Sequence, residues 1–162
     1  MTRVKQLCGF LLGLFLFNQL AFAMPIPHIE GYWKTIDDKS HKPRSIVHIF
    51  EDQGKYKGKI IVTYLEPGEH YTDVCKACSG KLKNQRILGM IFMTGLEQEG
   101  PASWGGGHII DPKNGHRYRC KATLSDDGKS LNVRGYLGIS LFGRSQTWLR
   151  VDKPNASEIP KV

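Results

Sequence analysis

The stretch HRYRCKATLSDDGKSLNVRGY, residues 116–136, predicts two β-strands joined by a tight turn. Between residues 116 and 124, one alternating set is His, Tyr, Cys, Ala and Leu, and the other is Arg, Arg, Lys and Thr. A period of two is typical of a strand with one face in the core and the other in water. The pattern returns in Ser130–Tyr136 after an Asp-Asp-Gly turn, so the stretch indicates an antiparallel hairpin.

Short apolar runs separated by turn residues recur along the rest of the chain. No segment keeps a 3.6-residue apolar period, which argues against long helices. Besides the two strands above, the predicted strands are Tyr32–Ile36, Ser45–Glu51, Tyr56–Tyr64, Arg86–Thr94, Gly107–Asp111 and Ser145–Val151. About eight short antiparallel strands favour an all-β fold, a small up-and-down β-barrel, because closure leaves no sheet edge exposed.

Two of the predicted strands are apolar on both faces. These runs are Ile46–Phe50 and Ile87–Met93. A barrel strand of this kind needs a cover on its outer side, which a terminal segment, a second copy in a homodimer, or lipid would provide.

The N-terminus has the pattern of a secretory signal. Arg3 and Lys5 precede an uncharged apolar run, Leu7–Phe17, and Ala21 and Ala23 form an Ala-x-Ala cleavage pattern. The run is shorter than the roughly 20 residues that span a bilayer, although an uncleaved anchor is the alternative. We expect a signal peptide over residues 1–23, one barrel domain over 24–151, a flexible tail over 152–162, and a periplasmic or secreted protein.

The composition narrows the classes of partner. The 162 residues carry 23 Lys and Arg against 15 Asp and Glu, a formal charge of +8. A hydrophobic content of 40% with 23% charged residues excludes a wholly disordered chain. The basic residues form no dense block, and export argues against nucleic acid. Anionic envelope components are therefore the expected electrostatic partners.

Six segments together carry a family resemblance. They are GYWKTIDD (31–38), PRSIV (43–47), DVCKACSG (73–80), GGHIIDPKNG (106–115), VRGYLG (133–138) and LFGRSQTWLR (141–150). In this order they resemble the exported bacterial proteins grouped as domain of unknown function 2147, over residues 30–151. The resemblance implies a lipocalin- or calycin-like barrel and no particular activity. It also implies a structural pair, Trp33 beneath Arg150 of the last strand, joined by a cation–π contact.

Cys75-x-x-Cys78 is the sharpest local motif, and it has three interpretations. After export, a short disulfide is expected. A metal site would need further ligands such as Cys120, His116 or His70. A thioredoxin-like redox pair would need a helix after it, which the following residues do not indicate. Cys120 makes the mature cysteine count odd. Its inward position favours a buried free thiol, while pairing with Cys75 or Cys78 stays open.

The segment Leu137–Arg144 is apolar where a hairpin loop should be polar. It either plugs the barrel mouth or is exposed as a contact patch. Arg134, Tyr136 and Arg144 flank it and are suited to orient an anionic head group. Trp104 opens a separate glycine-rich segment, Trp104–Gly107, which either covers a ligand as a mobile loop or is a bend before a strand. The predicted ligand-binding residues are Trp104, Arg134, Tyr136, Phe142 and Arg144.

No Gly-x-Ser-x-Gly, His-Glu-x-x-His or phosphate-loop motif is present, so no catalytic residue, cofactor or metal is predicted. The first hypothesis is a non-catalytic protein that binds a small apolar or amphipathic ligand inside the barrel. The second is an envelope interaction module that docks through its apolar rim loop and outer face. The third is a metal-dependent enzyme that uses the Cys/His cluster.

Overall fold

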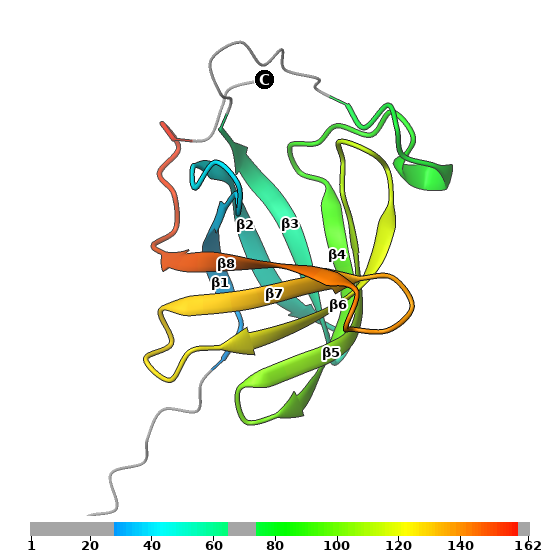
Figure 1. Ribbon diagram of the computed structural model, residues 1–162. Coiled ribbons are helices and arrows are strands. Elements are labelled where there is room, and N and C mark those ends of the chain that lie inside the picture. The colour runs from blue at the N-terminus through cyan, green and yellow to red at the C-terminus, as the bar shows by residue number, and fades with distance from the viewer. Residues whose placement is uncertain (1–27, 65–73, 159–162) are drawn as a thin grey trace, which may run out of the picture.

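The structure is a computed structural model that describes residues 28–64 and 74–158. These residues form eight antiparallel strands and the segments that connect them. Each strand pairs with the next in the sequence, and the last returns to the first, so the sheet closes into a barrel (Figure 1). The strands are β1 (Gly31–Ile36), β2 (Pro43–Asp52), β3 (Lys55–Thr63), β4 (Ile91–Gly100), β5 (Ser103–Ile110), β6 (Arg117–Leu124), β7 (Ser130–Tyr136) and β8 (Gly143–Val151). The predicted fold class is therefore confirmed.

The predicted signal peptide, its cleavage site and His70 lie outside the described residues. The segment between β3 and β4 contains a short 3-10 helix, η1 (Gly80–Leu82), which lies beside the β5–β6 turn (Figure 1). No helix within the described ranges has the length and hydropathy of a membrane span. After β8 the chain buries Pro154 and turns at Asn155, whose N–H donates to the Glu158 carboxylate at 2.8 Å.

Alternation decides which residues of β6 enter the core. Cys120, Ala122 and Leu124 are buried, whereas Arg117 and Lys121 are exposed. The inner faces of all eight strands meet in one core that includes three tryptophans: Trp33, Trp104 and Trp148. The outer wall of β1 and β2 is covered in part by its own side chains, because the His48 ring stacks on Tyr32 and Phe50 with centroids 4.6 and 5.4 Å apart.

β4 begins at Ile91 rather than at Arg86, and the predicted end of β4 and start of β5 are wrong because of glycine. The prediction puts Gly95–Gly107 largely in a loop, but both strands run through it and turn only at residues 100–103. Gly95 and Gly106 adopt positive φ angles of 74° and 71°, which only glycine reaches without strain. The pairing of β5 with β6 shifts register between Trp104 and Gly107, so the glycine run forms a bulge within a strand.

One end of the barrel is closed by Trp33 and Arg150. Trp33 is fully buried, its indole N–H donates to the carbonyl of Ile29 at 2.9 Å, and the Arg150 guanidinium lies 4.2 Å above its ring centre. Arg150 also donates to three backbone carbonyls at 2.7–2.8 Å, those of Gly128, Glu30 and His28. This end of the barrel is therefore both packed and hydrogen-bonded.

The Gly-x-Trp motif at this closed end has a steric basis. Gly31 has a φ of 121°, and a Cβ there would lie 3.0 Å from the Arg150 guanidinium. A side chain at residue 31 would therefore strain the backbone and press on the arginine that covers Trp33.

Cys120 is a free thiol enclosed by the barrel. Burial raises the pKa of Cys120 to about 12, so the thiolate that reacts with alkylating agents is scarce at neutral pH. We expect iodoacetamide at pH 8 to leave Cys120 unlabelled in the folded protein and to label it fully in guanidinium chloride. Peptide mapping by mass spectrometry reads both states, and equal labelling rates in the two would contradict this burial.

Candidate functional site

A cavity of about 1010 Å³ opens at the end of the barrel opposite Arg150. Its wall takes residues from the β1–β2, β5–β6 and β7–β8 loops and from the inner faces of the strands below them. Its deep part is apolar and buried: Ile60, Phe92, Val133 and Trp148 all line it, and the rings of Phe92 and Trp148 have centroids 6.2 Å apart. The cavity thus combines an aromatic floor with an open mouth.

Charged residues line the cavity near its mouth, and most of them are basic. The basic residues are Lys39, Arg44, Lys113 and Arg144, and the acidic residues are Asp37 and Asp111. An apolar interior beneath a charged rim matches the two halves of an amphipathic molecule.

Arg144 joins the β7–β8 hairpin to the β1–β2 loop across the mouth. Its Nε donates to Asp38 Oδ2 at 2.6 Å, its second nitrogen also bonds Asp38, and Asp37 lies 3.6 Å away. The backbone N–H of Ser40 lowers the pKa of Asp37, helped by the N–H of Lys39 and by Arg144. The lowered pKa favours the ionised form of Asp37, and the contacts with both aspartates hold the arginine in place.

The predicted ligand-binding residues fall into two groups. Tyr136, Phe142 and Arg144 line the cavity. Arg134 instead donates to the carbonyls of Ser140 and Leu141, at 2.8 and 3.0 Å, and to the Ser145 hydroxyl at 3.0 Å, so it shapes the β7–β8 loop from within.

The structure differs most from the prediction at Trp104. This residue lies in β5, 1% exposed, and packs edge-on against Tyr56 rather than lining the cavity. Trp104 pairs with Gln98 of β4, close to the β4–β5 turn and far along the strand from Ile110 at the mouth. It belongs to the core because the glycines beside it are part of a strand and not of a loop.

The β7–β8 loop, Leu137–Phe142, is exposed and does not plug the barrel. Four large apolar side chains of this loop are 58–75% exposed: Leu137, Ile139, Leu141 and Phe142. Leu137 and Phe142 also border the cavity, so the loop forms one side of its mouth.

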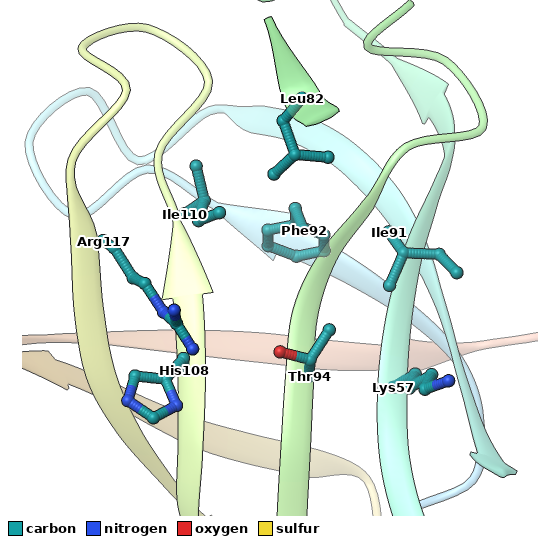
Figure 2. Close-up of a pocket in the computed structure, with 8 residues that line it drawn as sticks. All are labelled: Lys57, Leu82, Ile91, Phe92, Thr94, His108, Ile110 and Arg117. Atoms are coloured by element: carbon teal, nitrogen blue, oxygen red, sulfur yellow. The ribbon is translucent and has the colours of Figure 1, made fainter. Parts of the chain in front are cut away.

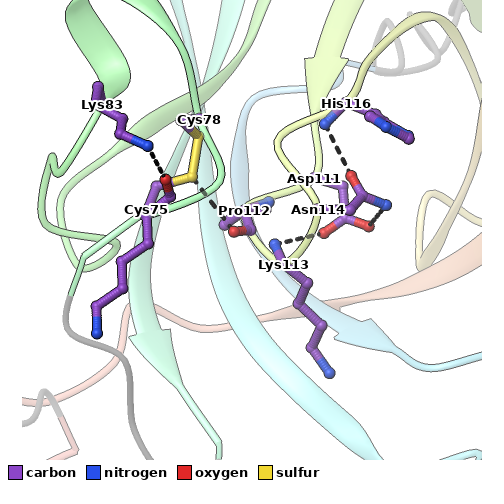
Figure 3. The surroundings of a disulfide bond; sticks show 9 residues. Cys75, Cys78, Lys83, Asp111, Pro112, Lys113, Asn114 and His116 are labelled. Atoms are coloured by element: carbon purple, nitrogen blue, oxygen red, sulfur yellow. Dashed lines mark hydrogen bonds between the residues drawn. A yellow bond between two sulfur atoms is a disulfide. The ribbon is translucent and has the colours of Figure 1, made fainter.

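Cys75 and Cys78 are joined in a disulfide beside the β5–β6 turn (Figure 3). Cys75 Sγ lies 3.3 Å from the carbonyl oxygen of Pro112. Gly115 has a φ of 70°, and a Cβ there would overlap the carbonyl oxygen of Ala77. Since Asp111, Pro112 and Lys113 line the cavity, the disulfide loop supports the turn that forms another side of the mouth.

The other residues that could bind a metal or transfer a proton lie apart from one another. In the parts of the chain that the structure describes, no three His, Cys, Asp or Glu side chains are placed to hold one metal ion. His116 lies next to Asn114, whose side chain accepts its N–H at 2.8 Å (Figure 3). His108 lies beside Arg117 at a smaller depression of about 330 Å³ on the β4–β6 wall (Figure 2). Burial lowers the pKa of His108, and the positive charges of Arg117 and Arg119 lower it further.

Comparison with known proteins agrees with this geometry. A family model described as "Uncharacterized protein conserved in bacteria (DUF2147)" matches residues 31–150. The chain belongs to the DUF2147 family. The matched region runs from Gly31, at the start of β1, to Arg150, so it covers the barrel except for Val151, the last residue of β8. A comparison with curated proteins finds no match.

Among solved structures, the DUF2147 chain is similar to one titled "Protein HP1028 from the human pathogen Helicobacter pylori belongs to the lipocalin family". The TM-score is 0.66 at 23% sequence identity, with 77% of this chain and 84% of that chain covered. The likeness shows a lipocalin-like fold.

Several features of the cavity in this chain were not expected from the sequence. The Asp38–Arg144 pair spans 106 residues, and the buried Phe92 and Trp148 at its floor come from strands that are not neighbours. The strand pattern does place Trp148 on the inner face, but alternation alone does not distinguish a residue that faces a cavity from one that faces packed core.

Proposed function

We propose that this protein is exported and binds a small amphipathic molecule in its barrel without transforming it. The observation that carries this proposal is the open cavity of about 1010 Å³ with a buried aromatic floor. The interior of an eight-stranded barrel is either filled by side chains or holds one small ligand, and an open cavity fits the second case. A space of this size is at the upper end of typical ligand pockets.

The charge of the mouth favours an anionic head group. Four basic residues and two acidic ones line the cavity. An apolar tail would displace water from the floor formed by Phe92, Val133 and Trp148, while a carboxylate or phosphate would remain at the rim near the basic side chains. The proposed ligand class is therefore a single-chain anionic amphiphile.

A fluorescent fatty acid tests this proposal. Dansyl-undecanoic acid should bind with saturable enhancement of dansyl emission, and oleate should displace it. Ile109→Trp places bulk in the cavity and should weaken binding about tenfold or more, because Ile109 is a half-buried part of the wall.

Ile91→Trp is the matched control, since Ile91 is equally half-buried but lines the outer depression and not the cavity. Equal affinities for the wild type and the Ile109→Trp variant, or emission that never saturates, would refute a cavity site. Native mass spectrometry of protein taken from the cell envelope without refolding would then weigh any ligand retained from the cell.

A further inference from the structure

The exposed loop beside the cavity concentrates apolar surface in one place. In residues 28–64 and 74–158, five large apolar side chains are exposed, and four of them lie in the six-residue β7–β8 loop. Leu141 and Phe142 are 75% and 72% exposed. Figure 1 shows this loop, in orange, projecting beyond the barrel wall. Apolar side chains gathered so closely at a loop tip are typical of a contact surface.

The loop is held in this conformation by polar contacts from beneath. Arg134 donates to the carbonyls of Ser140 and Leu141, and the N–H of Phe142 donates to the carbonyl of Ile139 at 3.2 Å. These bonds satisfy the backbone of the loop without using its side chains. The loop therefore presents its leucines, isoleucine and phenylalanine outward in a defined arrangement, as an insertion element requires.

The surroundings of the loop carry more basic than acidic side chains. Leu137 and Phe142 line the same cavity as four basic residues, and three aspartates lie at the same mouth, two of them in contact with Arg144. The basic residues are Lys39, Arg44, Lys113 and Arg144, and the acidic residues are Asp37, Asp38 and Asp111. Apolar side chains at a tip with basic groups behind them match the layers of an anionic bilayer, in which acyl chains lie beneath negatively charged head groups. A protein partner would have to supply an apolar groove bordered by acidic residues, whereas a lipid surface has both properties by nature.

We propose that the Leu137–Phe142 loop docks this protein onto an anionic lipid bilayer, with the cavity mouth facing the lipid. Ile139 and Leu141 insert between head groups, and the basic side chains around the mouth contact the phosphates. This goes beyond ligand binding and does not depend on it, because neither Ile139 nor Leu141 lines the cavity. An amphiphile would then pass between bilayer and barrel without crossing open water.

A tryptophan placed in the loop tests the insertion directly. The three native tryptophans are 0–1% exposed, so an added one in Leu141→Trp reports on the loop. With vesicles of phosphatidylcholine and phosphatidylglycerol, we expect its emission to shift to shorter wavelength and to be quenched by brominated acyl chains. The control is Leu149→Trp, an exposed leucine of β8 that pairs with Lys34 and lies outside the loop. Equal quenching in both variants, or none in Leu141→Trp, would overturn the proposal.

Vesicle flotation of the protein recovered from expressing cells gives the second measurement. The Ile139→Ser/Leu141→Ser variant should bind phosphatidylglycerol vesicles roughly tenfold more weakly than the wild type, whereas Leu149→Ser should bind as the wild type does. Unchanged flotation of the double variant would reject the loop as the anchor. A wild-type dimer that the double variant converts to monomer, with no vesicle binding by either, would assign the loop to a second copy instead. Dansyl-undecanoic acid binding, measured without vesicles, reports separately on the cavity.

Discussion

Replacing Gly115 by alanine is expected to lower the free energy of unfolding by about 2–4 kcal/mol. Two effects add at this position. The φ of 70° disfavours any residue with a Cβ, and that Cβ would overlap the carbonyl oxygen of Ala77 and lie 2.9 Å from the amide nitrogen of Cys78. The obstructing atoms belong to the backbone of the disulfide loop, so relief requires the loop and the β5–β6 turn to separate. Urea denaturation followed by tryptophan fluorescence measures the loss.

Gly128→Ala is the matched control for this substitution. Gly128 has nearly the same φ, 67°, but no atom lies within 4 Å of the place that an alanine Cβ would take, so only the conformational strain remains. We expect a loss of about 1 kcal/mol there. If the two variants lose the same stability, the disulfide loop does not press against the β5–β6 turn. The Gly115→Ala variant should also bind dansyl-undecanoic acid more weakly, because the displaced turn lines the mouth.

Replacing Arg150 by alanine should cost about 2–4 kcal/mol of unfolding free energy. The substitution removes the cation–π contact with Trp33 and leaves three carbonyl oxygens, those of Gly128, Glu30 and His28, without their donor. Arg150→Lys should recover only part of the loss, because a lysine ammonium does not present the same planar fork of donors. Thermal and urea denaturation measure both variants.

Arg119→Ala provides the comparison for Arg150. Arg119 also lies over an aromatic ring, that of Tyr136 at 5.9 Å, but it is exposed on the outer wall of β6. Its removal should change stability by less than about 0.5 kcal/mol. A similar loss for Arg119→Ala and Arg150→Ala would mean that the closed end of the barrel contributes little to stability.

The sequence predicts a strand best where one face of the strand lies in water and the other lies in the core. In β6 the alternation of Arg117, Arg119 and Lys121 with Tyr118, Cys120 and Ala122 is enough to predict both the strand and its inner side, and the burial of these residues agrees. The count of about eight such strands favours a barrel, and the resemblance to the 2147 family implies the lipocalin-like form of it. Local pattern and family likeness together therefore suffice for the fold class.

Glycine misleads the prediction because a glycine that forms a loop and a glycine that allows a bulge or a close contact within a strand look alike in sequence. Gly105, Gly106 and Gly107 indicate a loop, but here the absence of side chains lets β5 bulge and lets Leu96 and Cys120 approach it, since a Cβ on Gly107 would meet them at 2.7 and 3.1 Å. The prediction of Trp104 at the mouth follows from the same error. Only the three-dimensional neighbours of a glycine reveal which use applies.

The arginines of the β7–β8 hairpin show a second limit of prediction. Arg134 and Arg144 flank the same apolar segment, yet one bonds carbonyls of its own hairpin and the other reaches Asp38 across the mouth. Local spacing contains no information about which aspartate the barrel brings near. Long-range ion pairs of this kind follow from closure of the sheet and not from any motif.

The pairing order of the barrel also bears on how the chain reaches its native state. Seven of the eight pairings join strands that follow each other in the sequence, and only the β1–β8 pairing joins the two ends of the domain. The entropy lost in closing a long loop is therefore concentrated in one seam, and contacts within the successive hairpins form without it. Arg150 lies on that seam, and its carbonyl partners at residues 28 and 30 come from the opposite side. The residue that seals one end of the barrel thus also joins the first strand to the last, at the pairing whose closure costs the most chain entropy.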